Sequence, residues 1–159
     1  MSDQTTVRIL VYSDDRTVRQ SVRFALGTRV AADLPAIEIV EAATQPAVLA
    51  AMDAGDVTLA ILDGEAVPAG GMGLAHQLKD EVDDCPPILL LVARSADGWL
   101  ATWSRAEAVV RHPVDPIQLA QQVAGLLRQR LAEAAPAPST EASATESGAE
   151  ASGAEADEA

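Results

Sequence analysis

The sequence has few of the residues that build disulfide frameworks, nucleic-acid surfaces or aromatic cores. One cysteine, Cys85, in 159 residues excludes an internal disulfide and a cysteine-based metal cage. There are 11 Lys and Arg residues against 24 Asp and Glu, and the net charge of −13 argues against a nucleic-acid partner, because phosphate binding needs clustered cations. Aromatic residues make up only 3% of the chain, so we expect a core of aliphatic side chains.

The chain also lacks an apolar run long enough to span a bilayer, and its first ten residues, MSDQTTVRIL, show no signal-peptide pattern. We therefore expect a cytoplasmic protein. Hydrophobic residues make up 48% of the chain, which is enough for one domain with a core. The last residues contain Ala, Ser, Thr, Gly, Pro and acids but no large apolar side chain, which is typical of disorder. The expected organisation is a flexible start over 1–6, one domain over 7–132 and a disordered acidic tail over 133–159.

Short apolar runs alternate with segments of helical periodicity, and this alternation predicts an α/β fold. The expected fold is a flavodoxin-like, doubly wound sheet of five parallel strands in the order 2-1-3-4-5 with five helices. The last helix is expected to turn its apolar residues inward, Ile117 among them. Strands are expected at Val7–Tyr12, Ile37–Ala42, Val57–Leu62, Pro87–Ala93 and Ala108–Arg111, and helices at Arg16–Leu26, after Thr44, at Gly73–Val82, at Trp99–Ala106 and after Asp115.

Polar side chains follow three of these strands. Asp63 ends the third strand before a Gly/Pro-rich loop, Ser13, Asp14 and Asp15 follow the first, and His112 follows the fifth. In the order 2-1-3-4-5 these strand ends meet at one edge of the sheet. Carboxylates there form a hard oxygen site suited to Mg²⁺, and a carboxylate neutralised by a metal can attack a phosphoryl group. Alternatively, Asp63 is only a polar strand end, and Asp14 or Asp15 only caps the next helix.

The whole folded region resembles the receiver domain of two-component response regulators. RILVYSDDRTVRQSVRFAL resembles the opening of that family, LAILDGEAVP its phospho-acceptor strand and loop, and VVRHPVDPIQL its last strand and lysine-proline turn. The resemblance implies that Asp63 lies at the phospho-acceptor position and that Asp14 lies at one of the two acidic metal positions. An active site of this kind would bind Mg²⁺ through Asp14 and Asp63. The resemblance also implies a cis peptide bond before Pro113.

Four positions depart from the pattern of that family. The second acidic position holds Ser13, the hydroxyl position holds Val92, the aromatic switch position holds Val109 and the lysine position holds His112. Ser13 removes a charge from the metal site, and Val92 has no hydroxyl that could donate to a phosphate oxygen. These departures predict a pseudo-receiver, a binding module without catalysis and without a cofactor. The alternative is a live single-domain response regulator, phosphorylated on Asp63 by a histidine kinase.

A narrower resemblance concerns the amino-acid sequences of three segments, ILDGEAVPAGGMG, WLATWSRAE and HPVDPIQL. They are similar to the orphan receiver-like proteins of mycobacteria and related actinobacteria, which are associated with respiratory complex I, the NADH:quinone oxidoreductase. This resemblance implies an accessory subunit on the cytoplasmic side of a membrane enzyme.

Trp99 and Trp103 account for half of the four Trp, Tyr and Phe residues in the chain. Their spacing of four places both rings on one face of a helix. Core packing would explain such a pair, but Trp is also the residue most enriched at binding hot spots. We predict that the two rings form a partner-binding surface.

Overall fold

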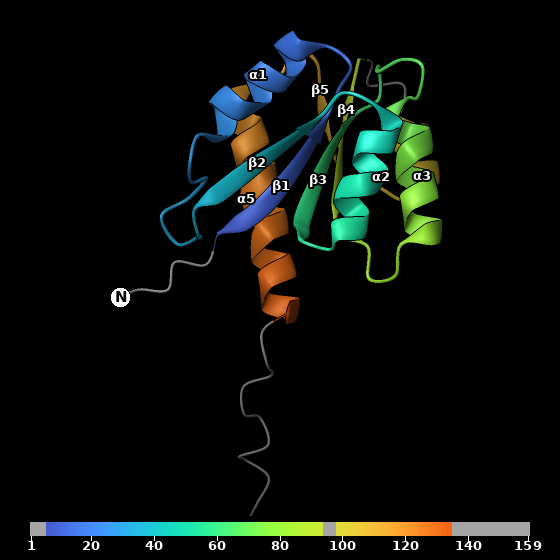
Figure 1. The fold of residues 1–159 in the computed structure, drawn as a ribbon. Coiled ribbons are helices and arrows are strands. Elements are labelled where there is room, and N and C mark those ends of the chain that lie inside the picture. The colour runs from blue at the N-terminus through green and yellow to red at the C-terminus, as the bar shows by residue number, and fades with distance from the viewer. Residues whose placement is uncertain (1–5, 94–97, 135–159) are drawn as a thin grey trace, which may run out of the picture.

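The computed structural model describes residues 6–93 and 98–134, and within these ranges five parallel strands alternate with five helices (Figure 1). The sheet has the predicted order β2-β1-β3-β4-β5. The predictions for residues 1–5 and for residues 135–159 of the acidic tail lie outside the described residues. The elements are β1 (Val7–Tyr12), α1 (Arg16–Leu26), β2 (Ile37–Ala42), α2 (Gln45–Ala54), β3 (Val57–Asp63), α3 (Gly71–Glu81), β4 (Ile88–Val92), α4 (Gly98–Ser104), β5 (Ala108–Arg111) and α5 (Pro116–Ala134).

Three helices begin at the predicted capping residues. The Asp15 carboxylate accepts a hydrogen bond from the backbone N–H of Thr17 at 2.8 Å, the Thr44 hydroxyl caps α2, and the Asp115 carboxylate caps α5. Each cap supplies an acceptor to an N–H group that has no partner inside its helix. Asp15 is therefore confirmed as a helix cap.

The core consists of two aliphatic layers, one on each face of the sheet, because successive strand residues point to opposite faces. Ile9 and Ile61 lie with α1 and α5 on one face, and Leu10 and Leu62 lie with α2 and α3 on the other (Figure 1). All four side chains are fully buried. Both faces of the central strands are thus covered, as their continuous apolar sequences predict.

The prediction that Ile117 faces inward is wrong, because this side chain is 70% exposed. Successive helical residues are about 100° apart, so Ile117 lies about 200° from Leu119 around the axis of α5. Leu119 is fully buried against the sheet, which turns Ile117 toward solvent.

Several element boundaries differ from expectation by one or two residues. The strand β3 extends to Asp63, β4 spans Ile88–Val92 where Pro87–Ala93 was expected, and α4 spans Gly98–Ser104 where Trp99–Ala106 was expected. The helix α3 begins at Gly71, two residues before the expected start, and α5 runs to Ala134, past the expected domain end at 132. None of the described helices is long and apolar enough to cross a membrane.

Candidate functional site

The ends of β1, β3 and β5 meet at the carboxyl edge of the sheet, as the predicted strand order requires. An open pocket of about 370 Å³ lies there. It is lined by Asp14, Asp15, Val18, Asp63, Glu65, Ala93 and His112.

Asp63 is the last residue of β3, lines this pocket and is only 2% exposed. The Ser13 hydroxyl lies 2.7 Å from Asp63 Oδ2. The other oxygen, Oδ1, accepts the backbone N–H of Glu65 at 2.9 Å and lies 3.0 Å from His112 Nε2. Which of the two atoms donates in this last contact depends on the tautomer of the imidazole, and beside an ionised carboxylate the donor is Nε2. Both oxygens of Asp63 are therefore bonded within the protein.

Ser13 is fully buried, and each of its polar atoms has a partner. Its hydroxyl accepts the backbone N–H of Asp15 at 3.0 Å, so its only proton is directed at Asp63. Its own N–H donates to the carbonyl of Ala42 at 3.2 Å, and its carbonyl accepts from Arg19 Nη1 at 2.7 Å. Ser13 is thus fixed as a donor to the carboxylate.

The backbone of His112 is hydrogen-bonded to the last residue of β4, and His112 precedes a cis proline. Its backbone N–H donates to the carbonyl of Val92 at 2.8 Å. The peptide bond between His112 and Pro113 is cis, which confirms the expectation taken from the resemblance. The imidazole therefore reaches Asp63 from the end of β5, where the resemblance implies a lysine.

Asp14 and Asp63, the two carboxylates that the resemblance assigns to a metal, line one pocket, but the side chains here do not form a cage of three protein ligands. Asp14 is exposed, and its side chain makes no hydrogen bond or ion pair in the described part of the chain. Ser13 is neutral, and its proton points at Asp63 Oδ2. Across residues 6–93 and 98–134, no group of three or more His, Cys, Asp or Glu side chains is arranged to hold a metal ion. The structure thus brings Asp14 and Asp63 to one pocket without forming a metal-ligand set.

The loop after Asp63 lies tightly against the strand ends. A Cβ atom on Gly71 would lie 2.7 Å from the backbone carbonyl of Asp63, and one on Gly64 would lie 2.9 Å from the carbonyl oxygen of Leu91. The buried Tyr12 hydroxyl donates to the carbonyl of Ala69 in the same loop. Burial is the main cause that raises the pKa of Tyr12, followed by the negative charges of Asp14 and Asp63. The absence of a Cβ atom at Gly64 and Gly71 allows the loop to pack this closely against the strand ends.

Val92 and Val109, the two other positions that depart from the resembled pattern, have apolar surroundings. Val92 is 1% exposed and belongs to the core layer beneath α2 and α3, and Val109 packs against the same layer. Neither side chain can donate a hydrogen bond to an anion in the pocket. Val92 therefore cannot replace the hydroxyl of the resembled pattern, and Val109 cannot replace its aromatic ring.

Trp99 and Trp103 lie outside the core, with exposed fractions of 68% and 48%. The core-packing interpretation is therefore wrong for this pair. The Trp103 ring stacks on His76 of α3, with ring centroids 4.2 Å apart and planes inclined by 7°. The Nδ1 atom of His76 also lies 3.1 Å from the carbonyl oxygen of Trp103. Their binding role stays a prediction.

Two polar residues near the site, Arg19 and Glu41, are not singled out by the sequence. Arg19 and Glu41 form an ion pair at 3.0 Å, and Arg19 also reaches the carbonyl of Ser13. Glu65 accepts the backbone N–H of Ala93 at 3.3 Å and so joins the loops after β3 and β4. An arginine on the first helix and an acid near the end of the second strand were the only available signals, and neither is specific.

Comparisons with known proteins agree with this fold. No family model matches the chain. Two curated proteins of Mycobacterium tuberculosis, each described as an uncharacterized response regulatory protein, are 60% identical over 124 residues, which is 78% of this chain and 93% of each relative. A receiver domain protein of Methanospirillum hungatei is 21% identical with a TM-score of 0.66, covering 81% of this chain and 99% of its own. A chemotaxis response regulator of Vibrio cholerae is 19% identical with a TM-score of 0.66, covering 77% and 100%.

Proposed function

The chain belongs to the response-regulator family and has the receiver fold, and from this premise we propose that it is a pseudo-receiver. In this proposal the protein is a non-catalytic module that binds a protein partner. Asp63 is a structural carboxylate in it, and the module works without Mg²⁺ or another cofactor.

The surroundings of Asp63 are the observation that carries the proposal. Both of its oxygens already have partners, Ser13 on one and Glu65 and His112 on the other, and the carboxylate is 2% exposed. An acyl phosphate would form on one of these oxygens, and forming it would break contacts to Ser13 or His112. A metal ion bound to Asp63 would share these oxygens with the groups that already contact them.

We further propose that the partner is respiratory complex I and that the protein is an accessory subunit on its cytoplasmic side. Support comes from the resemblance of the loop after Asp63, the α4 segment and the turn before α5 to the orphan receiver-like proteins of actinobacteria. The 60% identity to mycobacterial relatives agrees with that group. The docking surface in this proposal is α4, whose rings Trp99 and Trp103 are exposed.

An affinity pull-down of the tagged protein from detergent-solubilised membranes tests this proposal, with mass spectrometry of the captured proteins. We expect subunits of the NADH:quinone oxidoreductase near equal stoichiometry. The double variant Trp99→Ala and Trp103→Ala should lose them, whereas Asp63→Ala should keep them. Phe24→Ala is the matched control, because Phe24 is an 84% exposed ring on α1. Recovery of only a kinase or a soluble effector, with nothing from the membrane, would refute the proposal.

The alternative function is a live response regulator in a two-component phosphorelay. One observation favours it, because Asp14, Asp15, Asp63 and Glu65 line the same open pocket. Incubation with acetyl phosphate and Mg²⁺, followed by phosphate-affinity electrophoresis, separates the two functions. A retarded band that disappears in Asp63→Ala would favour the live regulator. The pseudo-receiver predicts one band in both proteins.

A further inference from the structure

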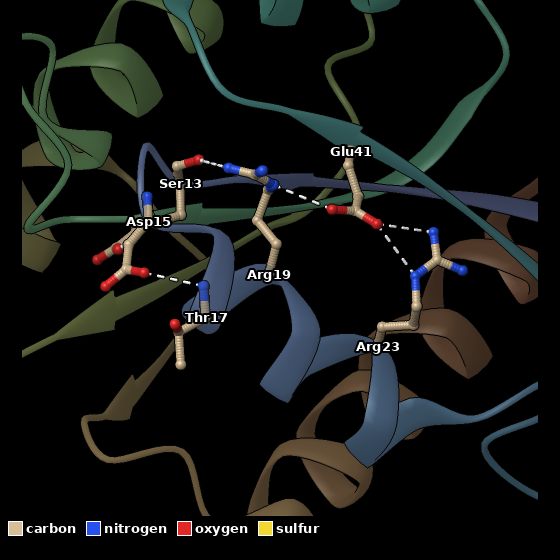
Figure 2. A network of polar contacts seen from close by, with 7 residues as sticks. Ser13, Asp15, Thr17, Arg19, Arg23 and Glu41 are labelled. Atoms are coloured by element: carbon tan, nitrogen blue, oxygen red, sulfur yellow. Dashed lines mark hydrogen bonds and ion pairs between the residues drawn. The ribbon is translucent and has the colours of Figure 1, made fainter.

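A chain of polar contacts runs from Arg23 on α1 through Glu41 on β2 to Arg19 and Ser13 (Figure 2). Arg23 on α1 donates to Glu41 Oε2 through Nε at 3.0 Å and Nη2 at 2.9 Å. The other oxygen of Glu41 accepts from Arg19 Nε at 3.0 Å, and Arg19 Nη1 reaches the carbonyl of Ser13 at 2.7 Å. The network thus ends on the residue that donates to Asp63.

Arg19 is the member of the network that contacts the site. Its side chain is 15% exposed, whereas that of Arg23 is 52% exposed and has no contact with Ser13 among its hydrogen bonds in the described residues. A guanidinium presents its donors in a rigid planar fork, so contact with Glu41 fixes the direction of the donor that faces Ser13. The two arginines therefore share one carboxylate but differ in what they can position.

The orientation of Ser13 determines which atom its hydroxyl proton faces. Its carbonyl has Arg19 as partner, its N–H has the carbonyl of Ala42, and its hydroxyl accepts from the N–H of Asp15. Losing Arg19 would leave a buried carbonyl without its donor, which is costly enough for the backbone to turn toward water. Turning the backbone moves the hydroxyl away from Asp63.

We propose that Arg19 is a positioning residue, held by Glu41, which fixes Ser13 so that its hydroxyl permanently donates to Asp63. This inference rests on the proposed function, in which Asp63 is held in the fold and is not phosphorylated. The negative charge of Glu41 is part of the arrangement. The hydrogen bond from Arg19 is the largest cause that lowers the pKa of Glu41, followed by the hydrogen bond from Arg23.

A double-substitution cycle on the full chain tests this role. The readout is the ¹³Cγ chemical shift of Asp63, which responds to hydrogen bonds on that carboxylate. Ser13→Ala should shift this resonance in the native background and equally in Arg23→Gln. In Arg19→Gln, which has already released Ser13, the shift caused by Ser13→Ala should be lost.

Arg23→Gln is the matched control, because it removes one cation from Glu41 and leaves the contact between Arg19 and Ser13 in place. An equal Ser13→Ala shift in the Arg19→Gln and Arg23→Gln backgrounds would overturn the positioning role. If Arg19→Gln does not fold, Arg19→Lys and Arg23→Lys give the same comparison, because one ammonium cannot reproduce the planar fork. The readout needs no partner, so failure of the pull-down and failure of this inference are distinguishable.

Discussion

Replacing Ser13 by Ala is the sharpest single test of how Asp63 is held. The substitution removes only the Oγ atom, which donates to Asp63 Oδ2 at 2.7 Å and accepts from the N–H of Asp15 at 3.0 Å. Oδ1 keeps its contacts with Glu65 and His112. Asp63 is 2% exposed, so water cannot replace the lost donor unless the loops open.

The expected loss follows from the charge on the acceptor. A hydrogen bond to a charged group contributes about 1.5–3 kcal/mol net, roughly twice the value for a neutral pair. The N–H of Asp15 also loses an acceptor, but Asp15 is exposed and water can take that place at little cost. We therefore expect Ser13→Ala to lower the free energy of unfolding by about 2 kcal/mol.

Urea unfolding followed by far-ultraviolet circular dichroism measures this loss as a lower midpoint with an unchanged slope. Ser21→Ala is the control, because Ser21 is an exposed serine on α1, where such changes stay within about 0.5 kcal/mol. A Ser13→Ala loss no larger than that of the control would refute the buried donor. A full loss that persists in an Asp63→Ala background would refute Asp63 as its acceptor.

Three further predictions concern the supports of the site. Gly71→Ala should destabilise the fold by about 1–3 kcal/mol, because the added Cβ would lie 2.7 Å from backbone atoms. Gly73→Ala on the same helix has open space around the added Cβ and should stabilise the fold by about 0.5–1 kcal/mol. Urea unfolding compares the two variants. Glu41→Gln should cost most stability near neutral pH and progressively less as the pH falls. The lowered pKa of Glu41 stabilises the fold at pH values above the ordinary pKa of 4.5, and this gain is lost as the pH drops through the lowered pKa. Unfolding curves from about pH 7 to about pH 3 check this, and a difference that stays constant with pH would contradict it. Tyr12→Phe should cost about 1 kcal/mol and speed amide exchange in the loop that holds Ala69, measured by hydrogen–deuterium exchange, and unchanged exchange there would contradict the contact.

The sequence predicts the sheet well because its signals are local and mutually consistent. The strands β1, β3 and β4 are dense apolar runs, and Asp15, Thr44 and Asp115 stand where helix caps were expected. Strand order then places Ser13 and His112 beside Asp63 without any knowledge of side-chain geometry. The prediction that Ile117 faces inward was wrong because it counted the apolar residues of α5 without following their angles around the helix axis.

The contacts that complete the site could not be predicted in the same way. Arg19 and Glu41 are 22 residues apart, and each belongs to a type that normally faces solvent. The bond between Glu65 and Ala93 depends on the conformations of two loops, which no periodicity encodes. The stacking of His76 on Trp103 likewise depends on the packing of α3 against α4, and the sequence offers only an isolated histidine.

The location of the two tryptophans also determines what the intrinsic fluorescence of this protein can report. They are the only tryptophans in the chain, both lie on α4, and neither belongs to the buried core. Their emission therefore reports the environment of one helix surface and the ring stacked on it. Anything that covers α4 will change the signal, while rearrangements beneath α1 and α5 will leave it almost unaltered. The molecule thus carries its own optical probe at the surface where we expect its partner to bind.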